Sequence, residues 1–210
     1  EQKMLGGSFG VAMLRNGMSV VLMLSFFLML DRPRLPIKKA VFSYVVFGMS
    51  MIIVYSLWYQ CANASFVKMG SLSSLPMIGI FCILMSRDAI YVSLYKMGVG
   101  FYLFSVGTFL GVDVSRWWFE GNLWVDILVR FLSFTIMLSF TWKKLRRQFL
   151  DSLDFLVEEM DIFSTFTLFI SVFLGALIAY LPNLQFFTVF NIVRAFFVLA
   201  MAGFLQYTIL

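Results

Sequence analysis

The stretch LWVDILVRFLSFTIMLSFTW, residues 123–142, is long and apolar enough to cross a lipid bilayer as one helix, which needs about 20 residues. Its only charged residues, Asp126 and Arg130, are four apart and can pair on one helix face. The apolar residues run continuously, without the alternation that marks the strands of a membrane barrel. Because hydrogen bonding restricts spanning segments to helices or closed barrels, this stretch predicts a transmembrane helix.

The composition extends this prediction to the whole chain. The 210 residues are 61% hydrophobic and only 13% charged, whereas a soluble domain is about a quarter charged. The mean hydropathy is +0.93. One soluble core cannot hide so much apolar surface, so lipid must cover most of it. We expect an all-α, polytopic transmembrane helix bundle whose first partner is the lipid bilayer.

The bilayer-length criterion predicts about seven transmembrane helices, with six as the alternative. Their approximate bounds are 10–30, 40–60, 75–95, 92–111, 123–142, 163–181 and 190–210. The third and fourth divide one apolar stretch at Arg87 and Asp88, because this stretch is too long for one helix and tight for two. Pro76 is expected to open the third helix. Together, residues 1–210 are expected to form a single transmembrane domain.

The distribution of lysine and arginine predicts the orientation. Three connecting segments that alternate correctly to share one side carry nine of these residues: Arg32, Arg34, Lys38, Lys39, Arg87, Lys143, Lys144, Arg146 and Arg147. The opposite side carries Lys3, Lys68 and Arg116. Because basic residues collect on the cytoplasmic side, we expect a multi-pass plasma membrane protein with its N-terminus outside and Leu210 in the cytoplasm.

The two ends of the sequence suggest a piece of a longer protein. Glu1 is not an initiator methionine, and Leu210 lies within an apolar run with no polar tail after it. We therefore expect the natural protein to continue beyond this sequence.

An amphipathic segment separates the fifth and sixth predicted spans. Within residues 148–162, apolar residues recur at intervals of three and four, with acidic residues on a neighbouring stripe. This pattern predicts a short helix along the cytoplasmic interface. The basic residues before it are expected to anchor it to anionic lipid: Lys143, Lys144, Arg146 and Arg147. A tethered connector is the simpler interpretation, and a docking face for a cytosolic domain is the alternative.

Charged residues within predicted spans are candidates for function, because burying a charge in a bilayer is costly. Asp126 and Arg130 either line a pocket open to the exterior or form a neutral pair that fixes helix register. Arg194 and Asn191, near the outer end of the last span, are expected to meet Asp126. These four residues form the predicted ligand site.

The remaining intramembrane charges and a glycine pair have simpler interpretations. Arg15 and Lys96 have long side chains, which we expect to snorkel toward an interface. Gly107 and Gly111 have the GxxxG spacing that allows two helices to approach closely.

The chain contains no histidine. This excludes, for the sequence as it stands, zinc proteases, Cys-His and Ser-His nucleophile pairs, and haem ligation by histidine. No phosphate-binding loop, metal-ligand spacing or nucleic-acid-binding module is present in the sequence. We predict no catalytic residue, no metal site and no nucleic-acid partner.

The segment PMIGIFCILMSRD, residues 76–88, followed by FYLF at residues 101–104, resembles the membrane-embedded sensor region of Agr-type bacterial sensor histidine kinases with GHKL ATPase domains. The likeness also covers the basic end of the fifth span, the amphipathic segment and the two closing helices. The resemblance implies a domain that passes an extracellular signal, in some relatives a peptide, to a cytoplasmic kinase.

The same resemblance implies further partners. A homodimer and a response regulator are expected for the full-length kinase. The phosphoacceptor histidine and the ATP-binding domain of the family would follow the last helix. ATP and Mg²⁺ are therefore expected only in that missing module, and no cofactor is expected in this chain.

Two other classes of membrane protein have a similar size. A small-molecule carrier, or the substrate-binding membrane subunit of an uptake system, is the alternative function; inverted repeats would favour it. Agr-type peptide-processing proteases also span the membrane repeatedly, but they resemble a Cys-His enzyme and this chain has no histidine.

Overall fold

The computed structural model describes residues 9–156 together with residues 165, 167, 169, 170 and 200. The described residues form helices and no β-strand. Its elements are α2 (Phe9–Leu30), α3 (Ile37–Cys61), α4 (Asn63–Met85), α5 (Ile90–Trp118), α6 (Leu123–Phe140), a π-helix η1 (Thr141–Leu145) and α7 (Arg146–Leu156). The all-α prediction is confirmed for this part of the chain.

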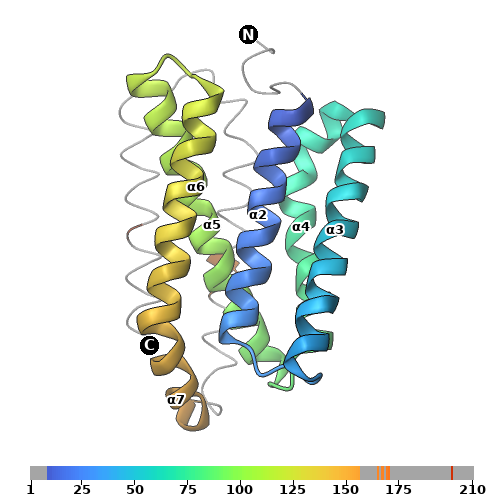
Figure 1. Cartoon of the computed structure of the whole chain (residues 1–210), viewed down its shortest axis with the longest axis vertical. Helices are drawn as coiled ribbons and strands as arrows, with labels where there is room; N and C mark the ends of the chain where they lie inside the picture. Colours follow the sequence, from blue (N-terminus) through green and yellow to red (C-terminus); the bar gives the residue numbers. More distant parts are fainter. Residues whose placement is uncertain (1–8, 157–164, 166, 168, 171–199, 201–210) are drawn as a thin grey trace.

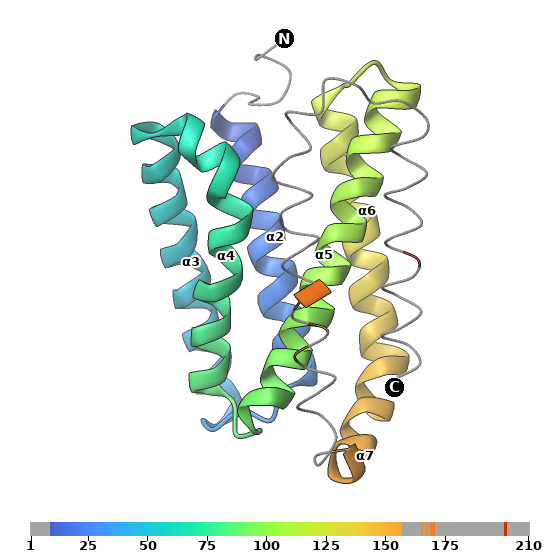
Figure 2. The same ribbon diagram turned by 180° about the vertical axis from the view of Figure 1, so that it is seen from behind.

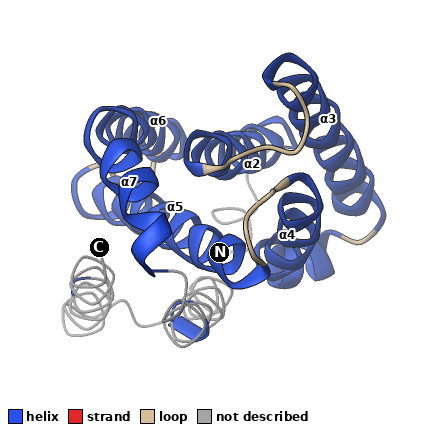
Figure 3. Ribbon diagram, turned by 90° about the horizontal axis from the view of Figure 1, so that it is seen from below, coloured by secondary structure: helices blue, strands red, loops and turns tan. Residues whose placement is uncertain are grey.

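The helices from α2 to α6 run side by side and alternate in direction (Figures 1 and 2). The central helices are α2 and α5. Helix α2 contacts α3, α5 and α6, and α5 contacts α4 and α6 as well as α2. The view along the bundle shows α3 and α4 on one side of this central pair and α6 on the other (Figure 3).

Four helical segments of the described chain are long and apolar enough to cross a membrane. They are Phe9–Leu30, Ile37–Cys61, Ile90–Trp118 and the continuous segment Leu123–Asp151, whereas α4 contributes only the shorter apolar part Pro76–Met85. Large apolar side chains face outward, as on Phe42 of α3, which is 69% exposed, and Ile136 of α6. These features are those of a membrane protein, since soluble proteins rarely expose contiguous apolar surface on this scale.

The predicted count of seven helices is not supported by this part of the chain. The windows 10–30, 40–60 and 123–142 correspond closely to α2, α3 and α6 with the start of η1. The last two predicted spans, 163–181 and 190–210, lie outside the described residues apart from a few positions.

The third and fourth predicted windows are wrong in their bounds. The division at Arg87 and Asp88 is confirmed, because α4 ends at Met85 and α5 begins at Ile90. However, α4 begins twelve residues before the predicted start at residue 75, so that Pro76 lies inside the helix instead of opening it. The first half of α4 is rich in serine, which lowers its hydropathy without preventing a helix.

Helices α5 and α6 approach closely because two glycines of α5 face α6. A side chain on Gly107 would overlap the ring of Phe134, and one on Gly111 would lie 2.5 Å from Asp126 Oδ1 and 2.7 Å from Arg130 Cγ. The GxxxG prediction of close helix approach is confirmed for this pair of helices. The space beside Gly111 is filled by an ion pair, described below.

Two connections at one end of the bundle are joined to each other. The N–H of Arg34, in the α2–α3 loop, donates to the carbonyl of Met85 at 2.9 Å, and the N–H of Arg87 donates to the carbonyl of Arg32 at 2.9 Å. These bonds form an antiparallel bridge between Pro33 and Ser86. The α2–α3 loop and the α4–α5 turn are thereby held in one register.

The same end of the bundle carries η1 and α7 (Figure 1). The three segments that hold the nine basic residues therefore share one end, as predicted. The amphipathic segment is helical over residues 146–156 and follows α6 without a break through η1. Its predicted start at residue 148 is two residues late, and its predicted end at 162 lies outside the described residues.

Candidate functional site: two buried charge networks

The first network joins α2 to α6 at the end of the bundle away from the basic segments. Asp126 is 2% exposed. Its carboxylate accepts from Arg130 Nε at 2.6 Å and pairs with Arg15 Nη2 at 2.6 Å. We call Arg15, Asp126 and Arg130 the Asp126 triad. The predicted i,i+4 pair of Asp126 and Arg130 is confirmed.

The snorkelling prediction for Arg15 is wrong. Its side chain is only 20% exposed, and its guanidinium binds Asp126 in place of an interface. The physical reason is that a carboxylate within reach offsets more of the cost of burying a guanidinium than lipid headgroups further away. Arg15 thus ties the second turn of α2 to the first turn of α6.

Helix α5 completes the surroundings of the triad. Arg130 Nη1 donates to Thr108 Oγ1 at 3.3 Å, and the absence of a side chain at Gly111 leaves room for the carboxylate. Asp113 and Arg116, further along α5, lie within electrostatic range of one another, and Arg116 also of Arg15 and Asp126. These three arginines and two aspartates carry a formal net charge of +1.

The second network lies at the basic end and is centred on Lys96. This side chain is 0% exposed. Its ammonium group lies 3.0 Å from Asp31 Oδ1 and also pairs with the carboxylate of Asp88. The snorkelling prediction for Lys96 is therefore also wrong, because two carboxylates compensate the buried charge where it lies.

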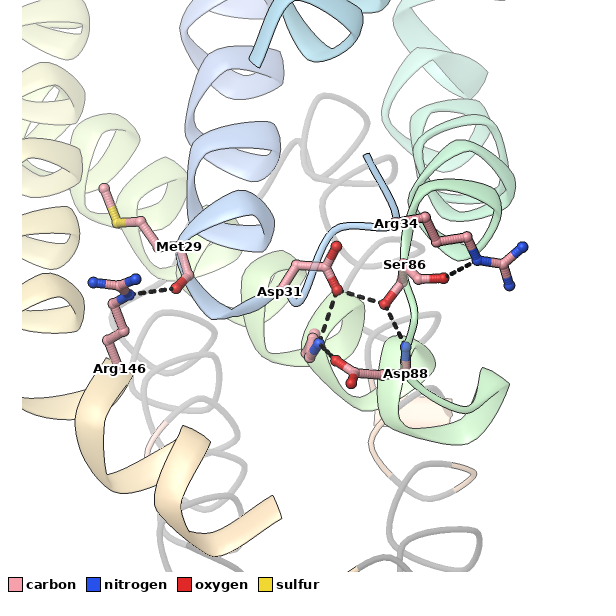
Figure 4. Close-up of polar contacts among 7 residues, drawn as sticks. Met29, Asp31, Arg34, Ser86, Asp88 and Arg146 are labelled. Atoms are coloured by element: carbon pink, nitrogen blue, oxygen red, sulfur yellow. Dashed lines mark hydrogen bonds and ion pairs between the residues drawn. The ribbon is translucent and has the colours of Figure 1, made fainter. Parts of the chain in front are cut away.

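Ser86 connects the Asp31 carboxylate, the backbone of Asp88 and the paired loops (Figure 4). Its hydroxyl donates to Asp31 Oδ1 at 2.5 Å and accepts from the N–H of Asp88 at 3.1 Å. Its carbonyl accepts from Arg34 Nε at 2.5 Å. We call Lys96, Asp31, Asp88 and Ser86 the Lys96 junction.

The Lys96 junction extends to α7 through aromatic rings. Lys96 Nζ lies 5.5 Å from the centre of the Phe27 ring and 5.9 Å from that of Phe149. Phe149, on α7, is buried and stacks on Tyr95 of α5 with ring centres 6.0 Å apart. Such cation–π contacts add to the stabilisation of a buried ammonium group. One lysine of α5 therefore contacts α2, the α4–α5 turn and α7.

Two arginines bind backbone carbonyls between α2 and α7. Arg146 Nε donates to the carbonyl of Met29 at 3.1 Å (Figure 4), and Arg32 Nη2 donates to the carbonyl of Leu150 at 3.1 Å. The first of these bonds places a cation at the C-terminal end of α2, where the helix dipole favours it. In contrast, Lys143 and Lys144 are exposed.

Sequence reasoning missed three members of the Lys96 junction: Asp31, Ser86 and Asp88. A signal was available, since Asp31 and Asp88 are the acidic residues of two connections at the basic end, and Asp88 lies only eight residues before Lys96. The remaining predicted site residues, Arg194 and Asn191, lie outside the described residues, so their meeting with Asp126 stays a prediction. Among the described residues, no group of three or more His, Cys, Asp or Glu side chains could hold a metal ion.

Both networks use buried ion pairs to link segments that are far apart in the sequence. Each has a buried carboxylate shared between two donors from different segments, so that a change of partner on one segment alters the contacts of another.

Comparison with protein-family models, curated proteins and solved structures finds no match for this chain.

Proposed function

We propose that the chain is the transmembrane signal-input region of a two-component sensor histidine kinase, which passes an extracellular signal to a cytoplasmic kinase module. The observation that carries the proposal is the position of α2 between the two networks. Arg15 of α2 pairs with Asp126 at one end. Asp31, directly after α2, pairs with Lys96 at the other.

The proposed orientation follows from the basic residues. With the nine-residue basic end in the cytoplasm, the Asp126 triad lies in the outer half of the bundle. A ligand anion that drew Arg15 away from Asp126 would free α2 to move against α6. Such a ligand shifts the conformation only by the difference between its affinities for the two arrangements.

Two connections lead from the triad to α7. One is the continuous helix through α6 and η1. The other runs along α2 to Asp31, Lys96 and Phe149. In the proposed function, α7 carries the change toward the kinase module. The π-helix η1 is a suitable place for a change in helix direction, since such segments are frequent at functional sites.

The proposal is tested first on the gene and then on the intact protein. The reading frame after the codon for Leu210 should encode a histidine-bearing helix and an ATP-binding domain. In membranes that contain the full-length protein, Arg15→Gln and Asp126→Asn should change autophosphorylation from ATP. Glu120→Gln, which removes a negative charge from an exposed residue at the same end as the triad, should leave it unchanged.

Two outcomes would contradict this function. A stop codon directly after Leu210 would remove the kinase module, and unchanged autophosphorylation in both triad variants would remove the triad from the signalling path. After the first outcome the carrier becomes the leading alternative, since charged residues inside membrane helices also mark substrate and ion pathways. Uptake of a labelled solute by vesicles containing only this chain would then support it.

A further inference from the structure

Eight of the nine basic residues at one end of the bundle fall into two structural groups, and the ninth, Arg147, pairs with Asp151. Four arginines bind backbone carbonyls: Arg34 that of Ser86, Arg87 that of Arg34, Arg32 that of Leu150 and Arg146 that of Met29. Four lysines do not. Lys38, Lys39, Lys143 and Lys144 are exposed and make no ion pair or hydrogen bond with another residue of the described chain.

Three acidic residues of this end, among those whose side chains the structure describes, are already paired. Asp31 and Asp88 both bind the ammonium group of Lys96 inside the bundle. Asp151 lies 3.9 Å from Arg147. The charges of the four lysines are therefore not neutralised by these carboxylates, and they are available to an external anion.

The surroundings of the lysines identify the anion. Lys38 and Lys39 lie in the first turn of α3, beside the exposed side chains of Ile37 and Phe42. Phe42 is four residues after Lys38 and therefore lies on the same helix face. A soluble polyanion would gain nothing from the exposed apolar side chain of Phe42, whereas a phospholipid presents a phosphate group and an acyl chain together.

Lys143 and Lys144 have similar neighbours. They lie in η1, directly after the exposed aromatic residues Phe140 and Trp142. Tryptophan is favoured at the level of the lipid headgroups because its ring is amphipathic. The two lysine pairs lie at the same end but on opposite sides of the bundle, one at the base of α3 and one below α6 (Figures 1 and 3).

We propose that these two lysine pairs are binding sites for anionic phospholipid headgroups, with the adjacent apolar residues against the acyl chains. The pairs hold one end of the bundle at the headgroup level on both sides. This inference needs the chain to lie in a bilayer and does not depend on the kinase function.

The test uses the full chain in bilayers of mixed lipid. Trp142 is kept as the only tryptophan, with the other four replaced by phenylalanine, and its fluorescence is quenched by lipids with brominated acyl chains. Brominated phosphatidylglycerol in phosphatidylcholine is compared with brominated phosphatidylcholine in phosphatidylglycerol. In a tryptophan-free background, Phe42→Trp reports on the α3 pair in the same way.

We expect stronger quenching by the anionic lipid at both positions. Each lysine contributes about fivefold to local anionic-lipid association at low salt. The variant Lys143→Gln/Lys144→Gln should therefore lower the preference at Trp142, and Lys38→Gln/Lys39→Gln should lower it at position 42. Arginine at the same positions should retain it, because arginine keeps the charge.

Salt provides a measurement that needs no substitution. Raising the ionic strength should weaken the preference of the unsubstituted lysine sites, since exposed charges are screened. Inorganic phosphate should do no more than chloride at equal ionic strength. Equal quenching by both lipids, a preference that survives in the glutamine variants, or a selective loss with inorganic phosphate would each overturn the proposal.

Discussion

At the scale of single residues, Lys96 shows how a charge is accommodated inside an apolar bundle. Its ammonium group has the carboxylates of Asp31 and Asp88 and two aromatic rings around it. Desolvation of a buried charge costs several kcal/mol, and these contacts offset that cost. Loss of the Lys96 ammonium group would leave the carboxylates of Asp31 and Asp88 without their buried cation.

Replacement of Lys96 is therefore expected to be costly. Lys96→Met should lower the free energy of unfolding by about 3–5 kcal/mol, because two buried carboxylates lose their cation. Unfolding in mixed detergent micelles measures this loss. The triple variant Lys96→Met/Asp31→Asn/Asp88→Asn, which is neutral, should recover part of the stability; equal losses in the single and triple variants would contradict a mainly electrostatic role.

Gly111 gives a second prediction at this scale. A methyl group there would lie 2.5 Å from Asp126 Oδ1 and 3.0 Å from the Asp126 carbonyl. Gly111→Ala should therefore displace the Asp126 triad and destabilise the bundle by about 1–3 kcal/mol. Gly10→Ala is the matched control, since nothing lies within 4 Å of the added carbon. The same unfolding measurement should separate the two variants, and equal stabilities would be inconsistent with the close packing at Gly111.

At the scale of the elements, hydropathy predicts helices better than it predicts their ends. The bounds of α2 and α3 follow from continuous apolar runs, whereas the serine-rich first half of α4 has no such run. That half is helical because a helix satisfies its own backbone hydrogen bonds, which does not require apolar side chains. Helix α4 was therefore predicted twelve residues too late.

The candidate site shows the same division between local and distant information. The pair of Asp126 and Arg130 follows from their spacing of four residues in one helix. The pairing of Arg15 with Asp126 depends on how α2 packs against α6, and the spacing of residues within one helix does not predict that packing. The Lys96 junction likewise depends on the bridge between Pro33 and Ser86, which belong to two connections that are far apart in the sequence.

The docking of α7 is testable through Phe149. Phe149→Ala removes a buried ring that stacks on Tyr95 and lies near Lys96 Nζ. We expect α7 to detach locally, so that trypsin cleaves after Arg146 and Arg147 faster than in the unsubstituted chain. Asp151→Asn, an exposed change on the same helix, should have little effect. Cleavage at the same rate in both variants would show that Phe149 does not hold α7.

At the scale of the whole molecule, the α2–α3 loop, the α4–α5 turn and η1 lie at one end of the bundle, and the α5–α6 connection lies at the other (Figure 1). Their sides of the membrane can be measured with introduced cysteines in a Cys61→Ser background, where the remaining Cys82 is buried. Lys39→Cys and Lys144→Cys should react with a membrane-impermeant maleimide only from the cytoplasm, and Glu120→Cys only from outside. Reaction of Lys39→Cys and Lys144→Cys from different sides would contradict the fold, and a reversed pattern for all three would contradict the proposed orientation.

The coupling between the two ends is tested most directly by hydrogen–deuterium exchange of the α7 amides in the Asp126→Asn variant of the full chain. Loss of the Asp126 charge should loosen α2 against α6, and the change should reach α7 through the Lys96 junction, with faster exchange over residues 146–156. The control Glu120→Gln removes a negative charge from an exposed residue at the same end and should leave α7 unchanged. Faster exchange around residues 15 and 126 with no change in α7 would contradict the proposed transmission.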